Sequence, residues 1–371
     1  MVSLEEVNQE DNRSVYIHIP FCKKICTYCD FCKMFYNEEL VDKYLIALEK
    51  EVSLLYKGSL LKTIYVGGGT PSCLNKRSLN KLFSIIDRFN LDNDVEFTFE
   101  CNINDITEDL LVFLKNNKVN RLSIGIESFN NRVLNILGRD YTGIDIDKRI
   151  DLVKKYFNNI NIDLIYGVRS QSLDDLKDDL EKFIGLDINH ISIYSLILED
   201  NTMLKIINYK EIDEDLNREM YDYIVSFLED NGYIHYEISN FSKKGYFSKH
   251  NLNYWDNDRY YGFGLGASGY INNIRYTNTR SLSKYTSGNF LYEKDIVSKR
   301  VDMENFMILG LRKMKGVSNK VFNDRYNTNI EDVFDVSKLE KKGDYYYIGR
   351  ENIYISNYIL EDFIDIESDY E

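Results

Sequence analysis

Hydrophobic and polar residues follow two different periods along the first two thirds of the chain. Short runs rich in Val, Ile and Phe predict strands, and the segments between them repeat apolar residues at helical spacing, as Leu40, Tyr44 and Leu48 do. The predicted strands are 15–19, 63–66, 94–100, 121–126, 160–166 and 190–198. The predicted helices that alternate with them are 38–56, 79–88, 107–115, 130–137, 146–157, 172–184 and 213–230.

The alternation of strands and helices predicts the fold class. Six strands, each followed by a helix, indicate parallel βα units. A complete eight-stranded barrel needs about 250 residues, more than these units span. We therefore expect an α/β fold with a partial (βα)6, TIM-like barrel that is open at one side. Because such folds carry their chemistry at the carboxyl ends of the strands, Glu100, Glu127 and Asp163 should meet at one mouth.

In the last third of the chain, the composition and the order of predicted elements differ from those of the first two thirds. A region rich in Tyr, Asn and Gly is followed by predicted helices at 306–314, 320–326 and 336–342, and then by a predicted hairpin of 345–348 with 353–355. Helices followed by a hairpin indicate a smaller α+β, winged-helix-like domain. The expected organisation is a barrel over 1–235, a connecting region over 236–300 and the winged-helix-like domain over 301–371.

The charge balance narrows the possible partners. Lys and Arg number 46 against 60 Asp and Glu, which gives a net charge of −14, and there is no long basic run. Nucleic acid is therefore not an expected partner. Residues 1–13 lack the apolar core of a signal peptide, and no apolar run reaches the ~18–20 residues that a membrane span needs. We expect a cytoplasmic protein without a transmembrane segment.

Four of the six cysteines fall within eleven positions, 22–32. In a chain that is not secreted, such a cluster indicates metal or redox chemistry rather than disulfides. Cys22, Cys26 and Cys29 have no distant Cys or His pair at zinc-site spacing, so a cubane iron–sulfur cluster fits them better than zinc does. Three cysteines would bind three irons and leave the fourth for a substrate or cofactor. Cys32 is the alternative fourth ligand.

The remaining thiols and most of the histidines are interpreted as structural. Cys73 and Cys101 are expected to be small buried apolar residues. His18, on the first predicted strand, and His190 and His235 are expected to have structural roles.

The cysteine pattern also carries a resemblance. The spacing CxxxCxxC after a first strand, with Tyr28 before the last cysteine, resembles the radical S-adenosylmethionine (SAM) superfamily. The strings YIHIPFCKKICTYCDF, VGGGTPS, RLSIGIESFN, NIDLIYG, HYEISNF and HNLNYW narrow the resemblance to the oxygen-independent coproporphyrinogen III oxidase family, and within it to the heme-chaperone (HemW) branch. The resemblance runs from about Tyr16 to Tyr270 and is looser in the C-terminal domain.

This resemblance implies a set of cofactor contacts. Cys22, Cys26 and Cys29 would bind a [4Fe-4S] cluster, and SAM would bind its open iron. The glycine run would present bare backbone to the methionine end of SAM, because glycine permits close approach. The residues that fall where the family contacts the cofactor are Gly67, Gly68, Gly69, Thr70, Tyr16, Tyr28, Glu100, Glu127, Arg139 and Asp163. Carboxylates can accept hydrogen bonds from amino and ribose hydroxyl groups, and an arginine can bind a carboxylate.

Three positions depart from the family pattern. Glu127 stands where the family usually has Gln, so this residue cannot donate when it is ionised and adds negative charge near the cluster. Val168 follows Tyr166-Gly167 where a proline is usual, and Ser268 stands where the chaperone-like pattern often has His.

Two features favour the chaperone branch. The oxidase branch extends the cluster motif with a CxC sequence, whereas Phe31 stands at that position here, and the segment before the first strand is short. The HNLNYW string matches a motif associated with the chaperone branch. Its His250 would be an axial heme ligand, with Tyr254 and Trp255 against the macrocycle. The alternative is a loop histidine beside a core aromatic pair.

The sequence therefore predicts a protein that binds heme and delivers it to recipient hemoproteins, supplied with electrons by a reductant such as flavodoxin or ferredoxin. The rival hypothesis is oxidative decarboxylation of coproporphyrinogen III to protoporphyrinogen IX, in which a 5′-deoxyadenosyl radical abstracts hydrogen from a propionate side chain. A third is a radical SAM enzyme that acts on another tetrapyrrole. No catalytic residue is assigned.

Overall fold

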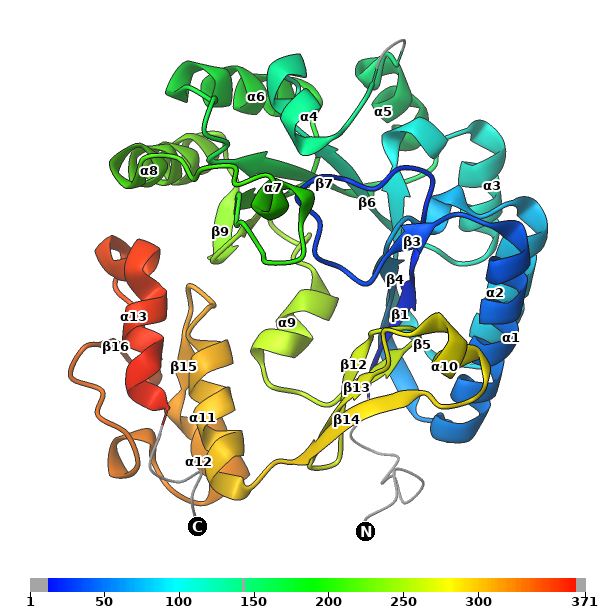
Figure 1. Ribbon diagram of the computed structural model, residues 1–371. Helices are drawn as coiled ribbons and strands as arrows, with labels where there is room; N and C mark the ends of the chain where they lie inside the picture. Colours follow the sequence, from blue (N-terminus) through cyan, green and yellow to red (C-terminus); the bar gives the residue numbers. More distant parts are fainter. Residues whose placement is uncertain (1–12, 142–143, 365–371) are drawn as a thin grey trace.

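The computed structural model describes residues 13–141 and 144–364 (Figure 1). Its centre is a nine-stranded sheet with the order β11-β1-β4-β5-β6-β7-β8-β10-β9. Six neighbouring strands run parallel, which confirms the partial (βα)6 barrel. They are β1 (Ser14–Ile19), β4 (Leu60–Gly68), β5 (Asn90–Asn102), β6 (Arg121–Glu127), β7 (Asn159–Tyr166) and β8 (His190–Ser195).

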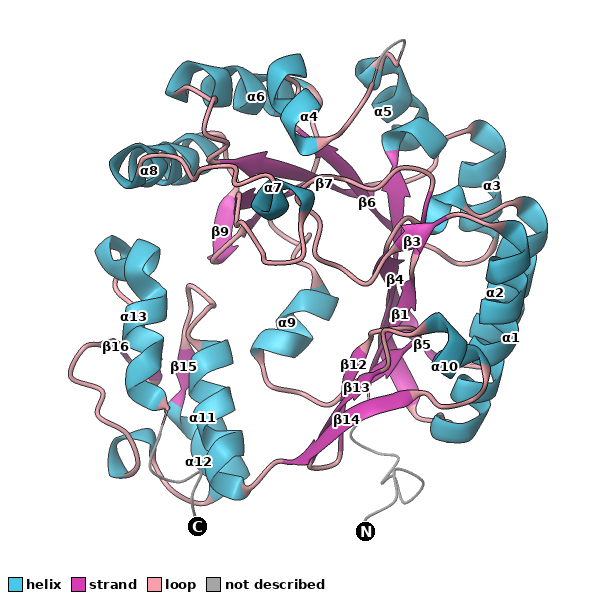
Figure 2. Cartoon of the chain, in the orientation of Figure 1, coloured by secondary structure: helices cyan, strands magenta, loops and turns pink. Residues whose placement is uncertain are grey.

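Helices cover the outside of this sheet (Figure 2). They are α1 (Glu38–Leu55), α2 (Lys76–Ile86), α3 (Glu108–Asn116), α4 (Asn131–Leu137), α5 (Ile146–Lys154), α6 (Leu173–Gly185) and α8 (Glu214–Asp230), with a 3-10 turn at Ile103–Asp105. Thr107 caps α3, and Ser172 and Asp175 form a capping box at α6, so local side chains set where these helices begin. The apolar faces of strands and helices form one core, in which Ile17 and Leu122 are fully buried.

The connecting region extends both edges of the barrel sheet. At one edge β11 (Tyr261–Phe263) pairs parallel with β1, and at the other β10 (Asn240–Ser242) runs antiparallel between β8 and β9 (Ile234–Glu237). Helix α9 (Lys249–Trp255) contacts β4. Three further strands form a separate antiparallel sheet, β12 (Ser268–Ile271), β13 (Ile274–Asn278) and β14 (Leu291–Ile296), beside the short helix α10 (Leu282–Thr286).

The C-terminal region has a second hydrophobic core, built around Met307, Phe322, Ile330 and Tyr346. Its elements are α11 (Lys299–Gly310), β15 (Val317–Ser318), α12 (Asn319–Tyr326), β16 (Glu340–Lys342), β17 (Tyr345–Tyr347) and α13 (Ser356–Leu360), with 3-10 turns at Ile330–Asp332, Arg350–Ile355 and Glu361–Phe363. Helices packed beside a small sheet of order β15-β17-β16 confirm an α+β region of the expected kind.

Two sequence predictions in this region are wrong. The predicted helix 336–342 is not formed, because residues 340–342 are strand β16. The hairpin pairs β16 with β17 across Gly343, whose φ of 61° supplies the left-handed turn between them. Residues 353–355, the expected second strand, lie in a 3-10 turn instead. The turn signal at Gly343 outweighs the weak helical periodicity before it.

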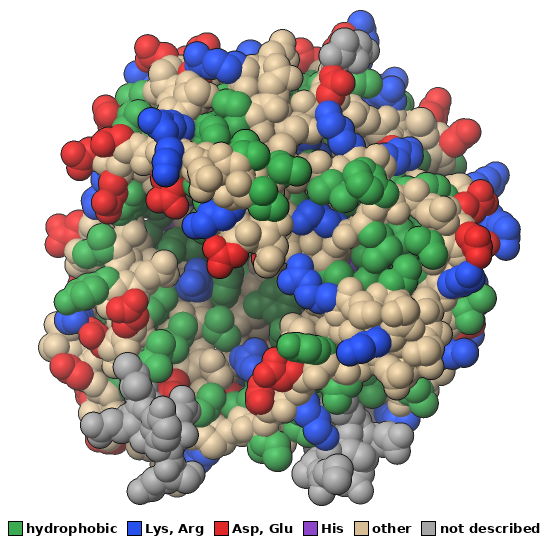
Figure 3. Space-filling model, viewed as in Figure 1, with side chains coloured by type: hydrophobic (Ala, Val, Ile, Leu, Met, Phe, Trp, Pro, Cys, Tyr) green, Lys and Arg blue, Asp and Glu red, His purple; other side chains and the backbone are tan. Residues whose placement is uncertain are grey.

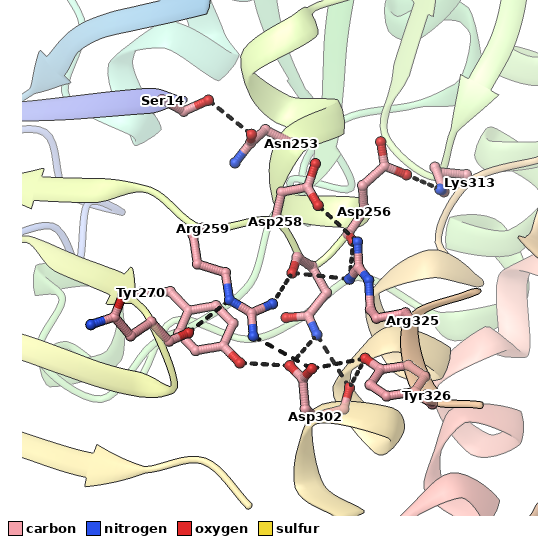
Figure 4. Close-up of polar contacts among 12 residues, drawn as sticks. Ser14, Asn253, Asp256, Asp258, Arg259, Tyr270, Asp302, Lys313, Arg325 and Tyr326 are labelled. Carbon is pink, nitrogen blue, oxygen red and sulfur yellow. Dashed lines mark hydrogen bonds and ion pairs between the residues drawn. The ribbon is translucent and has the colours of Figure 1, made fainter. Parts of the chain in front are cut away.

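Polar contacts join the C-terminal region to the segment after α9 (Figure 4). Asp302 of α11 accepts hydrogen bonds from Tyr270, Tyr326 and Asn257, at 2.5, 2.9 and 2.9 Å. The pKa of Asp302 is held below its usual value by these donors and by the nearby Arg259, although burial opposes the shift. This carboxylate therefore ties three chain segments together. No helix among the described residues combines the length and apolar character needed to cross a membrane.

Candidate functional site

The cysteine loop is closed at its base by a short parallel strand pair, β2 (Phe21–Cys22) and β3 (Met34–Phe35). The amide of Met34 donates to the carbonyl of Pro20 at 2.7 Å. In the middle of the loop, the Thr27 amide and hydroxyl donate to carbonyls at the end of α4, and its carbonyl accepts from Leu204 in α7 (Met203–Ile206). These contacts hold the loop over the carboxyl ends of the strands.

The structure brings most of the sequence-predicted residues to one cavity of about 140 Å³ at this mouth. Its lining includes Cys22, Cys26, Cys29, Tyr28, Gly68, Gly69, Thr70, Glu100, Glu127, Arg139 and Asp163. The loops that follow β1 and β4 and the strand ends of β5, β6 and β7 all contribute, as expected for parallel strands. This face of the molecule is hollowed at its centre, with Lys, Arg and hydrophobic side chains around the hollow (Figure 3).

The three thiols line one cavity, as a cluster that takes each thiolate on a different iron requires. Within residues 13–141 and 144–364, no three His, Cys, Asp or Glu side chains converge on a point where one metal ion would sit. A zinc site needs such convergence, whereas a cubane takes each thiolate on a different iron. Burial raises the pKa of Cys22 to about 11 and also raises the pKa of Cys26 and Cys29, so an electropositive partner is needed to hold them as thiolates.

Contacts within the protein set the backbone conformation of the glycine run. Gly68 has a φ of +110°, and a Cβ there would lie 2.4 Å from the ring of His18. Its amide donates to Glu100 at 2.9 Å, and the amides of Gly69 and Thr70 donate to carbonyls of the preceding strands at 2.8 and 2.9 Å. These three amides therefore already donate to acceptors within the protein. The loop can let a ligand approach its backbone closely, but it cannot offer the ligand these N–H donors. The 3-10 turn Pro71–Cys73 follows directly.

Two carboxylates of the cavity have pKa values raised by burial. Glu100 accepts from the Tyr65 hydroxyl at 2.8 Å and from the Gly68 amide, yet burial and the charge of Asp163 raise its pKa to about 7. Asp163 accepts from Asn161 at 2.8 Å and from Ser123 at 3.3 Å, and burial likewise raises its pKa. Both carboxylates can therefore gain from a cationic or hydrogen-bond-donating ligand.

Glu127 forms an ion pair with Arg139 in which both side chains are largely buried, 7% and 15% exposed. The same guanidinium nitrogen donates to the Tyr28 hydroxyl at 3.1 Å, and the buried Nε of Arg139 has no hydrogen-bond partner. The unusual Glu127 therefore does not add an uncompensated charge, because Arg139 neutralises it. Arg139 is correspondingly less free to bind a carboxylate of a ligand than the sequence suggests.

Several predicted contacts lie outside the cavity lining. Tyr16 is part of a chain of hydrogen bonds in which its hydroxyl meets His18 Nδ1 at 2.9 Å and His18 Nε2 meets the Cys32 carbonyl at 2.7 Å. Cys32 is buried against Gly266 and does not line the cavity. Gly67 also stays behind the cavity wall, where a Cβ would lie 2.6 Å from the Glu100 carboxyl group. Gly67 and Tyr16 can therefore act on the cavity only through their neighbours.

His250 lies inside the molecule at 1% exposure. Its Nδ1 meets the Thr63 hydroxyl at 2.7 Å and its Nε2 meets the Tyr254 hydroxyl at 2.8 Å, while the ring stacks on Tyr65. Burial lowers its pKa to about 3. To bind a heme iron, His250 would have to leave one of these hydrogen bonds, so its role as an axial ligand stays a prediction.

Some residues of the cavity were not singled out from the sequence. Lys24, Lys33, Asn102 and Ser123 line it as well. Ser123 could have been found, because alternate strand residues share one face, and it lies four positions before the predicted Glu127 in β6. The lysines gave no signal, since a surface loop often carries such residues.

Comparison with known proteins places this geometry in a family. Residues 16–183 match the model of the radical SAM superfamily. Over 330 residues the chain is 40% identical to the heme chaperone HemW of Lactococcus lactis, which covers 86% of this chain and 87% of that protein. It is 38% identical over 350 residues to the heme chaperone HemW of Bacillus subtilis, covering 89% and 92% of the two chains.

A solved structure shares the fold. Coproporphyrinogen III oxidase (HemN) from Escherichia coli, described as a radical SAM enzyme, superimposes with a TM-score of 0.85 over 97% of this chain and 92% of its own. The two sequences are 20% identical, so this likeness shows the common fold and does not choose between activities.

Proposed function

The chain belongs to the HemW heme-chaperone family of the radical SAM superfamily, and we propose that it binds heme and delivers it to recipient hemoproteins. The observation that carries this proposal is the 38–40% identity to relatives named heme chaperones, which extends over nearly the whole chain. Phe31 supports it, because it stands, 66% exposed, where the oxidase branch extends its cluster motif with a cysteine.

The radical SAM family implies a [4Fe-4S] cluster and SAM, and the cavity at the barrel mouth is the place we assign to them. Cys22, Cys26 and Cys29 are the proposed cluster ligands. A reduced cluster of this kind supplies an electron to the sulfonium of SAM. Asp163 and Glu100 would accept hydrogen bonds from SAM, and Gly69 and Thr70 would allow its close approach.

The remaining contacts are proposed to act in support. Tyr28 lines the cavity beside the Arg139–Glu127 ion pair, so it would help to fix this wall against SAM. Arg139 would offer its unpartnered Nε hydrogen to an acceptor. A reductant such as flavodoxin or ferredoxin and the recipient hemoprotein are the expected protein partners. His250 is retained as a proposed axial ligand, on the condition that it leaves Thr63 or Tyr254.

The rival function is the anaerobic oxidation of coproporphyrinogen III. The shared fold and the cavity are compatible with this function as well. The two functions predict different results for one anaerobic experiment on the reconstituted full chain. The chaperone hypothesis predicts that hemin binds and that coproporphyrinogen III with SAM and a reductant yields no protoporphyrinogen IX. Formation of protoporphyrinogen IX would reject the chaperone assignment in favour of the oxidase, and absence of hemin binding would reject it outright.

A further inference from the structure

The loop that carries the three proposed cluster cysteines is cationic, although the chain as a whole has a net charge of −14. It holds three lysines, Lys23, Lys24 and Lys33. Its carboxylate, that of Asp30, has one oxygen buried, and Arg280 of the connecting region donates to the Asp30 carbonyl at 2.8 Å. Four cations from two distant segments of the chain therefore gather at this loop.

Most of this positive charge is not neutralised by the protein itself. Lys23 forms an ion pair with Asp105 at 2.7 Å. Lys33 and Arg280, in contrast, donate to backbone carbonyls of the loop, which carry no net charge. Lys24 is exposed, and its ammonium group has no ion pair in the part of the chain that the structure describes. Three positive charges therefore remain available to a partner.

An exposed aromatic side chain lies among these cations. Phe31 is 66% exposed and lines the proposed cluster cavity together with Lys24 and Lys33. Figure 3 shows Lys, Arg and hydrophobic side chains around the central hollow of this face. The carboxylates of the cavity, Glu100 and Asp163, belong to strands beneath the loop, so they face the cavity rather than a protein that docks on the loop. An aromatic residue bordered by charged groups is a common composition of protein–protein contacts.

We propose that an acidic one-electron carrier protein, of the flavodoxin or ferredoxin type, docks on the surface formed by Lys24, Phe31, Lys33 and Arg280. We call these four residues the donor surface. One electron passes from the docked carrier to the cluster, so that [4Fe-4S]²⁺ becomes [4Fe-4S]⁺ and the carrier is oxidised by one electron, and no atom is transferred. The inference rests on the proposed cluster and its reductant and does not depend on heme delivery.

The charge distribution favours such a partner. An acidic carrier is repelled by the chain as a whole, so attraction confined to the donor surface selects the orientation in which the carrier meets the cysteine loop. Electron transfer needs this orientation, because its rate falls steeply with the distance between the two redox groups. Electron-transfer contacts are also among the smallest protein interfaces, so a few residues suffice. A nucleic acid is disfavoured, since three cations do not offset the net charge of −14 towards a phosphate backbone.

Two larger hollows in the described part of the molecule do not offer the same charge. The cleft of about 830 Å³ beside α2 and α3 is bordered by two lysines but also by two aspartates. In the cleft of about 720 Å³ between β9 and the C-terminal region, Lys313 pairs with Asp256 and Arg325 pairs with Asp258 (Figure 4). Neither hollow borders on the three cluster cysteines. Both are therefore poorer docking sites for an acidic electron carrier.

The test measures how fast the reconstituted cluster of the full chain is reduced under anaerobic conditions, from the loss of its visible absorption. Reduced flavodoxin is the protein donor, and photoreduced deazaflavin is a small, uncharged donor that needs no docking. Lys24→Glu should slow reduction by flavodoxin at least about fivefold at low ionic strength, and Phe31→Ala at least about threefold. Reduction by deazaflavin should stay within about twofold of the parent rate in both variants.

Matched controls come from α1, on the outside of the barrel. Lys50→Glu makes the same change of charge at an exposed lysine, and Ile46→Ala shortens a side chain that is 52% exposed on the same helix. Both should keep the rate with flavodoxin within about twofold of the parent rate. Lys24→Arg keeps the positive charge and should keep the rate as well. Iron content and circular dichroism check that each variant holds its cluster and its fold.

The dependence on salt adds a second readout. The parent rate with flavodoxin should fall as ionic strength rises, and the rate of Lys24→Glu should fall less. A parent rate that does not change with salt, or equal rates for Lys24→Glu and Lys50→Glu, would show that the assignment of the donor surface is wrong.

Equal slowing with both donors would also overturn the assignment, because these side chains would then act on the cluster itself. A parent chain that holds no cluster would overturn it together with the proposed cofactor. Failure to bind hemin, or formation of protoporphyrinogen IX, rejects the proposed heme chaperone function instead, and it changes none of the reduction rates on which the donor surface depends.

Discussion

The ion pair between Arg139 and Glu127 allows a quantitative test of the electrostatics at the barrel mouth. Arg139→Met replaces the arginine by an apolar side chain of similar length and leaves Glu127 buried without its cation. Glu100 and Asp163 add to the unfavourable charge there, because each carboxylate raises the pKa of a neighbour. Breaking a buried pair at one partner typically lowers the free energy of unfolding by about 3–5 kcal/mol.

Removing the charge of the other partner, Glu127, should lower the free energy of unfolding by less. Glu127→Gln keeps an acceptor for the guanidinium and restores the residue that the family usually has. Because the amide oxygen can still accept from Arg139, we expect a loss of about 1–2 kcal/mol. A surface pair serves as the control: Arg132 is 56% exposed and pairs with Asp175, so Arg132→Met should change the free energy of unfolding by about 0–1 kcal/mol.

Urea unfolding of the cluster-free chain, followed by circular dichroism at pH 7.5 and pH 5.5, measures these differences. In Arg139→Met the pKa of Glu127 rises further, since burial now acts without the guanidinium. A carboxyl group whose folded pKa is raised stabilises the fold at low pH and loses that contribution as pH rises through the folded pKa. The deficit of Arg139→Met should therefore shrink at pH 5.5. A deficit no larger than that of Arg132→Met, or one equal to that of Glu127→Gln, would refute this reasoning.

Three further predictions concern other residues. Cys26→Ala should abolish the binding of about four irons per chain on anaerobic reconstitution, whereas Cys32→Ala should not, because Cys32 lies outside the cavity lining; the reverse result would move the cluster. Asp163→Asn should weaken the SAM-dependent change in the EPR spectrum of the reduced cluster about tenfold without loss of iron, since a polar contact to a ligand contributes roughly 1–3 kcal/mol, and an unchanged titration would remove Asp163 from the SAM site. Burial raises the pKa of Glu51 to about 7, so its contribution to stability is complete below about pH 4.5 and is lost as pH rises to about 7; Glu51→Gln should flatten the fall in urea midpoint over this range, whereas the exposed Glu39→Gln should not.

The sequence alone determined the fold class because its signals are local. Six apolar strand runs alternate with amphipathic helices, and caps such as Thr107 and Ser172 act within their own helices. The cysteine spacing and the glycine run lie directly after strands, and parallel strands end at one edge, so their meeting at the mouth followed from connectivity. Where a local signal was misread, as at Gly343, a single backbone angle decided between helix and hairpin.

Only the tertiary structure decided which side chains are free to act. The pairing of Glu127 with Arg139, and the hydrogen bonds that occupy both nitrogens of His250, join residues from different elements. The Nε2 of His235 is buried without a hydrogen-bond partner, beside Phe241 and Tyr221, and no sequence pattern indicates this. A motif shows which groups are present, but burial and long-range contacts set their charge and their availability, because both depend on neighbours that the sequence keeps far apart.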